Sequence, residues 1–127
     1  MDSNSLFIPL QFKIDIFSAL EELLDRKIES VLISPVKREL EILSKEGSPE
    51  LRKKAKFALA LGSRCIYVRV AEKPSENTDD SIVRVAKEWK SPVFTNDKAL
   101  RKKLRDISVP VIYLRQKAQL EIDGLIS

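Results

Sequence analysis

The stretch "SPVFTNDKALRKKLRDISVPVIYLR", residues 91–115, places one strongly basic segment between two short apolar runs. The apolar runs, residues 92–95 and 109–114, are typical of buried strands because they are short and rich in β-branched side chains. The segment between them, residues 97–106, has leucines one helical turn apart among basic residues, which predicts an amphipathic helix. Strands separated by a helix indicate a parallel sheet with helices packed against it.

The same alternation extends towards the N-terminus. Apolar periodicity predicts helices over residues 16–24, 34–46, 48–59 and 79–89, and strands over residues 31–34 and 65–70. Ser34 stands before Pro35 and resembles an N-cap followed by proline at the first helical position. We therefore expect one α/β domain over residues 1–127, a three-layer α/β/α sandwich around a central, mainly parallel sheet.

The composition excludes several kinds of active site. The chain has no histidine, which excludes Ser-His-Asp and Cys-His nucleophile systems, histidine zinc sites and histidine as a general base. Any catalysis must then use carboxylates, hydroxyls, lysines or a hard metal ion bound through oxygen.

The single cysteine and the overall charge suggest a cellular setting. Cys65 lies in a strand-like run, so we expect a buried, unreactive thiol and a reducing, cytoplasmic environment. No apolar run approaches the ~18 residues of a membrane span, and no basic-then-apolar leader opens the chain, so no membrane association is expected. The net charge of +4 mildly favours a polyanionic partner.

Ligands bind a parallel sheet beyond the carboxyl ends of its strands, and four acids are candidates for such a site: Glu39, Asp79 and Asp97 follow predicted strands, and Asp2 stands at the very start. Three of them share a helical face with apolar residues that point towards the core. Glu39 lies with Val36 and Leu40, Asp79 with Ile82 and Ala86, and Asp97 with Leu100 and Leu104. Asp80, in contrast, lies on the face of Arg84 and Lys87.

Each of these acids also has a structural explanation. Asp79 and Asp97, taken singly, are better explained as helix caps that accept hydrogen bonds from the first backbone N–H groups. Glu39 lies too far into its helix to cap it, so a core salt bridge is its structural alternative, and Asp80 has no expected role beyond the first turn. Independent caps have no reason to gather on inward faces at one sheet edge, however. Taken together, the acids favour a metal site.

The same residues resemble the signature of the PIN-domain nucleases. That signature is an Asp-Thr/Ser-Asn opening, a Glu carried on a helix, a later Asp, and a Thr-x-Asp. The matching segments are "DSN" (Asp2-Ser3-Asn4), "SPVKREL" with Glu39, "DDSIVRVA" from Asp79, and "TND" (Thr95-Asn96-Asp97). Their order and spacing agree across nearly the whole chain. Residues 93–115 are similar to archaeal small PIN proteins, among them relatives of VapC-type toxins and of nucleases that process ribosomal RNA precursors.

The resemblance implies a PIN-like fold and an endoribonuclease that uses Mg²⁺ or Mn²⁺ to hydrolyse RNA phosphodiester bonds. The implied catalytic and metal-binding residues are Asp2, Glu39, Asp79 and Asp97. The residues implied to orient these carboxylates by hydrogen bonds are Ser3, Asn4 and Thr95. The implied partners are RNA, an antitoxin or an RNA-processing protein, and a second copy of the chain in a homodimer. A toxin and an RNA-processing enzyme both fit the resemblance.

Two basic helices have two interpretations of equal weight. The residues concerned are Lys98, Arg101 and Lys102 beside Asp97, and Arg52 and Lys53 in the earlier helix. They can bind RNA phosphates, or they can be the solvated faces of ordinary surface helices.

Two other functions are considered beside the nuclease. A phosphoacceptor receiver domain is disfavoured because neither the strand at 31–34 nor the strand at 65–70 is followed at once by an Asp. In the PIN family an apolar strand runs into the first Asp, whereas only Met1 precedes Asp2 here. This departure supports the second alternative, a catalytically silent PIN scaffold that acts in RNA binding or complex assembly.

Overall fold

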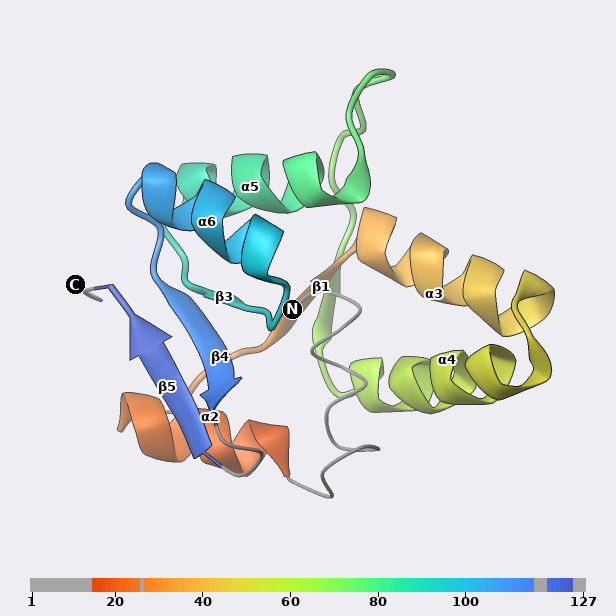
Figure 1. Ribbon diagram of the computed structural model, residues 1–127, viewed down its shortest axis with the longest axis horizontal. Helices are drawn as coiled ribbons and strands as arrows, with labels where there is room; N and C mark the ends of the chain where they lie inside the picture. The colour runs from red at the N-terminus through yellow and green to blue at the C-terminus, as the bar shows by residue number, and fades with distance from the viewer. Residues whose placement is uncertain (1–14, 26, 116–118, 125–127) are drawn as a thin grey trace.

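The computed structural model describes residues 15–25, 27–115 and 119–124 (Figure 1). Asp2, Ser3 and Asn4 lie outside this part of the chain. The described helices are α2 (Ile16–Leu24), α3 (Ser34–Glu46), α4 (Pro49–Gly62), α5 (Thr78–Trp89) and α6 (Lys98–Asp106). The described strands are β1 (Val31–Ile33), β2 (Ile66–Val68), β3 (Val93–Phe94), β4 (Val111–Arg115) and β5 (Gln119–Asp123).

The strands form two sheets within the described residues. β1 pairs in parallel with β2, and β3 pairs in parallel with β4. β5 continues the second sheet as an antiparallel partner of β4, with Ile112 opposite Ile122. The predicted, mainly parallel α/β arrangement is confirmed, whereas β5 was not predicted. Leu120 and Ile122 of β5 alternate with polar residues, and this period of two could have predicted the strand from the sequence.

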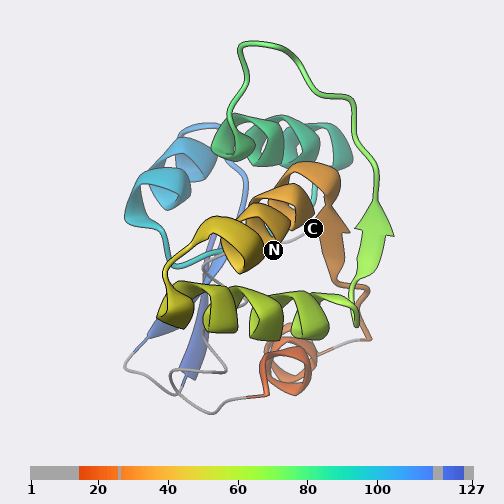
Figure 2. The same cartoon turned by 90° about the vertical axis from the view of Figure 1, so that its right-hand side faces the viewer.

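Helices lie on both sides of the strands. Figure 1 shows α5 and α6 above β3 and β4, with α2 on the opposite side, next to β5. Figure 2 shows α3 and α4 as an antiparallel pair, with β1 and β2 beside α3. No helix in the described part of the chain is long and apolar enough to cross a bilayer.

The core consists of the apolar faces predicted from periodicity. Ile16 of α2, Leu40 of α3 and the α6 residues Leu100 and Leu104 are all fully buried. Cys65 is buried as expected, and desolvation raises the pKa of its thiol. Burial therefore keeps this cysteine protonated and unreactive.

β2 differs from its prediction. It covers Ile66–Val68 and not residues 65–70, and the side chains of Ile66 and Tyr67 are 45% and 49% exposed. A buried parallel strand was expected, but β2 pairs only with β1 among the described residues and so lies at a sheet edge.

Ser34 also differs from its prediction, because it does not cap α3. The N-cap position belongs to Ile33, without a side-chain hydrogen bond. The hydroxyl of Ser34 instead accepts a hydrogen bond from the backbone N–H of Val70 at 3.0 Å. This contact fastens the chain that leaves β2 to the start of α3.

Candidate active site

The acids predicted to form the site lie near the starts of three helices. α3 follows β1, α5 follows the loop after β2, and α6 follows β3 (Figure 1). α3 contacts α5, and α5 contacts α6. Glu39, Asp79 and Asp97 are carried by these helices, each of them partly exposed.

Asp97 is the N-cap of α6. Its Oδ1 accepts hydrogen bonds from the backbone N–H groups of Ala99 at 2.9 Å and Leu100 at 3.2 Å. Its own backbone N–H donates to Oγ1 of Thr95 at 3.1 Å, and Thr95 is completely buried. The capping explanation is thus confirmed for Asp97. Both cap bonds use the same carboxylate oxygen, which leaves Oδ2 available for a second role.

Asp79 does not cap its helix. Asn77 holds that position, and its Oδ1 accepts a hydrogen bond from the backbone N–H of Asp80 at 2.8 Å. The helix begins at Thr78, one residue earlier than predicted, so Asp79 lies within the first turn. The capping explanation for Asp79 is therefore wrong, although an acid in the first turn still interacts favourably with the helix dipole.

Asp80 lies on the solvent side of α5. Its side chain is 47% exposed, and its Oδ1 lies 3.9 Å from Nζ of Lys103 on α6. An ion pair this exposed contributes little to stability. Arg84, expected on the same solvated face, is instead largely buried, with 19% of its side chain exposed.

Glu39 lines a groove between α3 and α5. The groove has a volume of about 600 Å³ and is bounded by the first two turns of α3, the loop of residues 71–77 and the start of α5. Glu39 lies next to the buried residues Val36 and Leu40 on α3 and faces Thr78 and Ser81 of α5 across the groove. The predicted inward face of α3 therefore opens onto a groove that solvent can reach.

The donor chemistry of these acids suits a hard cation, because carboxylate oxygens are the ligands that Mg²⁺ and Mn²⁺ prefer. No group of three or more metal-ligating side chains is close enough to hold an ion within residues 15–25, 27–115 and 119–124. Asp2 lies outside those ranges. The structure therefore carries Glu39, Asp79 and Asp97 on neighbouring helices without drawing all three together into one metal-binding cluster.

The loop of residues 71–77 closes one side of the groove and is held in place by Arg84. The guanidinium of Arg84 donates to both carboxylate oxygens of Glu76, with Nη2 2.9 Å from Oε1, and to the backbone carbonyl of Ala71. Ser81 Oγ donates to the same carboxylate at 2.9 Å. The hydrogen bonds from Arg84 hold the pKa of the Glu76 carboxyl below its ordinary value. Sequence reasoning missed this cluster, because residues 76 and 84 form no recognisable motif.

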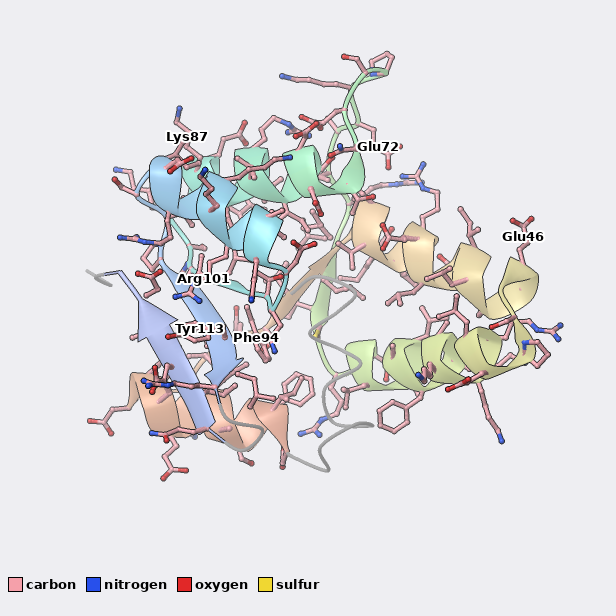
Figure 3. All side chains as sticks on the ribbon, in the orientation of Figure 1. Glu46, Glu72, Lys87, Phe94, Arg101 and Tyr113 are labelled. Carbon is pink, nitrogen blue, oxygen red and sulfur yellow. The ribbon has the colours of Figure 1, made fainter. Side chains whose placement is uncertain are left out.

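Arg101 has structural partners. Its Nε and Nη2 donate to Oδ2 of Asp123 at 3.2 and 3.1 Å, and its guanidinium stacks on the ring of Tyr113 (Figure 3). Arg105 approaches Oδ1 of the same aspartate at 3.3 Å. Both arginines hold α6 against β4 and β5. The other residues predicted to bind RNA, Lys98, Lys102, Arg52 and Lys53, are exposed.

Residues 1–117 match a protein family described as a PIN-like domain. The chain belongs to the PIN-like domain family. Ribonuclease VapC4 of Methanocaldococcus jannaschii is 35% identical over 127 residues, which cover 98% of this chain and 95% of that protein. Ribonuclease VapC9 of Archaeoglobus fulgidus is 30% identical over 125 residues, which cover 98% of this chain and 88% of that protein.

The PIN fold is also found in a similar solved structure. The structure of the PIN domain endonuclease Utp24 matches with a TM-score of 0.80 and 27% identity, covering 98% of this chain and 90% of that one. The predicted resemblance to the PIN family and the predicted fold class are both confirmed. PIN membership makes the edge where α3, α5 and α6 begin the candidate active site.

Proposed function

We propose that this protein is a divalent-metal-dependent endoribonuclease that hydrolyses RNA phosphodiester bonds. The observation that carries the proposal is the placement of Glu39, Asp79 and Asp97 on the starts of neighbouring helices in a chain of the PIN family. Its relatives of similar length are named ribonucleases. A site of carboxylates without histidine suits metal-assisted hydrolysis better than nucleophilic catalysis by a side chain.

The proposed ligands of Mg²⁺ or Mn²⁺ are Asp2, Glu39, Asp79 and Asp97. When bound, the metal ion polarises the phosphate and lowers the pKa of the attacking water. Glu39 and Asp79 would hold the cation or its waters, with Asp97 as a further ligand. Oδ1 of Asp97 caps α6, so we assign the metal-facing role to Oδ2.

Hydrogen bonds from neighbouring residues orient the carboxylates. Thr95 accepts the backbone N–H of Asp97 and thereby fixes the turn that presents its carboxylate. We assign Ser3 and Asn4 the same orienting role towards Asp2. Buried hydrogen-bond partners of this kind raise the precision with which ligands meet a metal.

RNA is drawn to the site by exposed cations. We assign phosphate contacts to Lys98 and Lys102 on α6 and to Arg52 and Lys53 on α4, all of which are exposed. Arg101 is assigned a structural role, because its guanidinium is already bonded to Asp123. Low aromatic content disfavours recognition of RNA sequence by stacking.

Two biological roles fit this chemistry. The chain can act as a toxin ribonuclease that an antitoxin holds in check, or it can process RNA precursors. We propose a cytoplasmic enzyme, in keeping with the buried thiol of Cys65, that acts as a homodimer. The two roles can be told apart by the neighbouring genes: a gene for a small antitoxin-like protein beside this one would favour the toxin role.

The decisive experiment is cleavage of short RNAs by the purified protein with Mn²⁺, with Mg²⁺ and with EDTA. We expect cleavage with either ion and none with the chelator. Glu39→Gln and Asp79→Asn should abolish cleavage, whereas Asp80→Asn, on the solvent side of α5, should leave it nearly unchanged. RNA that binds but stays intact under every metal condition would favour the silent scaffold over the enzyme.

A further inference from the structure

Two strands lead into helices that carry candidate acids, and both strands end in the same way. β1 runs into α3, which carries Glu39, and β3 is followed by α6, which Asp97 caps (Figure 1). In a parallel pair of strands, the backbone hydrogen bonds recur every second residue for as long as the strands run side by side. Where one strand turns away into a helix, the next N–H group of its neighbour loses its backbone acceptor and needs another.

At the end of β1, the replacement acceptor is the side chain of Ser34. The backbone N–H of Ile66 donates to the carbonyl of Ser30 at 2.7 Å, and the pairing of β1 with β2 continues to Val68. The next bond of this series would join the N–H of Val70 to the carbonyl of Ser34. The hydroxyl of Ser34 accepts that N–H instead, at 3.0 Å. The backbone of Ser34 can therefore already belong to α3.

Asn96 has the same role at the end of β3. The N–H of Thr95 donates to the carbonyl of Ile112 at 3.0 Å, as expected for the pairing of β3 with β4. The next bond would join the N–H of Leu114 to the carbonyl of Thr95. That N–H donates instead to Oδ1 of Asn96, at 2.7 Å. An asparagine amide oxygen accepts as a backbone carbonyl does, so the chain can turn here, one residue before Asp97.

The position of each acid depends on where its helix begins. One further residue of strand would rotate the side chains of the following helix by about 100°, because an α-helix has 3.6 residues per turn. Such a rotation would take Glu39 out of the groove and Asp97 out of its capping position. A metal ligand must be held within about 0.5 Å of its working position, so contacts that fix the start of a helix matter to a metal site.

We propose that Ser34 and Asn96 are positioning residues of the active site, Ser34 for Glu39 and Asn96 for Asp97. Each replaces the next carbonyl of its strand with a side-chain oxygen and so fixes where α3 or α6 begins. Neither side chain contacts the metal ion or the RNA. The inference rests on the proposed metal-dependent function, and it adds that the affinity for the metal depends on contacts with the neighbouring strands.

The test measures the dissociation constant of Mn²⁺ by titration of the purified protein, together with its melting temperature in EDTA. Ser34→Ala and Asn96→Ala should each weaken Mn²⁺ binding about tenfold, as expected when a group that orients a metal ligand is removed. Ser48→Ala is the matched control, because Ser48 caps α4 by accepting the N–H of Leu51, and α4 carries none of the candidate acids. It should lower the melting temperature about as much and leave Mn²⁺ binding unchanged.

Conservative variants that keep the acceptor oxygen should rescue the loss. Asn96→Asp places a carboxylate oxygen where the amide oxygen was, and Ser34→Thr keeps the hydroxyl. Both should restore Mn²⁺ binding to at least the strength of the parent. They should also retain slow hydrogen exchange at the backbone N–H groups of Leu114 and Val70, which the alanine variants should lose.

Double variants separate positioning from general damage to the fold. If Asn96 acts through Asp97, Asn96→Ala should weaken Mn²⁺ binding little further in a protein that already carries Asp97→Asn. In a protein that carries Glu39→Gln, the same change should still weaken binding about tenfold. The reverse should hold for Ser34→Ala. Equal losses in both backgrounds would overturn the positioning roles.

The outcomes also distinguish this inference from the proposed function. If the parent protein binds Mn²⁺ and cleaves RNA while Ser34→Ala and Asn96→Ala behave like Ser48→Ala, the positioning roles are wrong and the nuclease stands. A parent protein that neither binds Mn²⁺ nor cleaves RNA overturns both.

Discussion

The guanidinium carbon of Arg101 lies 3.8 Å from the centre of the Tyr113 ring, while the same guanidinium bonds Asp123. The flat face of the Arg101 guanidinium thus contacts Tyr113 of β4, while its N–H groups bond Asp123 of β5. This geometry is available to arginine and not to lysine, since only a planar guanidinium stacks and donates in parallel.

We therefore expect Arg101→Lys to destabilise the fold by about 1 kcal/mol through the lost stacking and the lost second hydrogen bond. Urea unfolding of the variant measures the change. Lys102→Ala, one position along and exposed, is the matched control and should fall within about 0.5 kcal/mol of the parent. Equal stability of the two variants would show that the Arg101 contacts contribute nothing measurable.

Asp97→Asn separates capping from metal binding. Asparagine is about as good an N-cap as aspartate, so the metal-free variant should keep its stability within about 0.5 kcal/mol, whereas Asp97→Ala should lose about 1 kcal/mol. If Asp97 also binds metal, Asp97→Asn should lose RNA cleavage and the rise in melting temperature that Mn²⁺ gives the parent. If Asp97→Asn cleaves RNA as well as the parent, Asp97 serves only as the N-cap of α6.

The Glu76–Arg84 pair should make stability depend on pH in the acidic range. Hydrogen bonds from Arg84 lower the pKa of Glu76 below its ordinary value of 4.5 in the folded state. The stabilisation is therefore complete above the unfolded-state pKa and is lost as the pH falls through the lower folded-state value. Urea unfolding at a series of pH values measures this effect. Between about pH 6 and about pH 3, the free energy of unfolding should fall less for Glu76→Gln than for the parent.

The control for this pH effect is Glu50→Gln. Glu50 pairs with Lys54 at 3.2 Å, but its side chain is 81% exposed. An exposed pair one helical turn apart contributes little, so this variant should follow the parent curve. If the free energy of unfolding varies with pH in the same way for the parent and for Glu76→Gln, the Glu76–Arg84 pair is not the cause of the pH dependence.

Gly47 ends α3, and a side chain there would not fit. An added Cβ would lie 2.8 Å from the carbonyl oxygen of Leu43 and 3.2 Å from a side-chain carbon of Leu51. Gly→Ala usually stabilises by reducing the entropy of the unfolded chain. At this position we expect destabilisation of about 1 kcal/mol, because the new methyl group meets backbone it cannot displace. A higher melting temperature for Gly47→Ala would contradict the prediction.

Features determined by local sequence were predicted well. The helical stripe of Leu100 and Leu104 and the cap at Asp97 depend on residues within one turn of each other. The alternation of apolar and basic runs in residues 91–115 indicated strand, helix and strand, because each element must bury one face. The sequence also indicated the candidate acids, since the PIN signature lies in their order and spacing.

Features that depend on distant residues were decided only by the tertiary structure. Ser34 lacks its predicted capping role because its hydroxyl meets Val70, which lies 36 residues away. Arg101, predicted to bind RNA, bonds Asp123, which lies 22 residues later in the chain. Asn77, and not Asp79, caps α5, directly after the loop whose Glu76 is bonded to Arg84 eight residues later.

The physical reason is the same in each case. Periodicity reports which face of an element is buried, but it does not report which polar group will lie opposite once the chain has closed its long loops. A serine, an arginine or an aspartate has several possible partners of similar strength, and packing selects among them. The sequence by itself therefore determined most of the elements, the family and the candidate acids, whereas the tertiary structure decided the pairing of β5, the partners of Ser34 and Arg101, and the loop that Arg84 holds beside the groove.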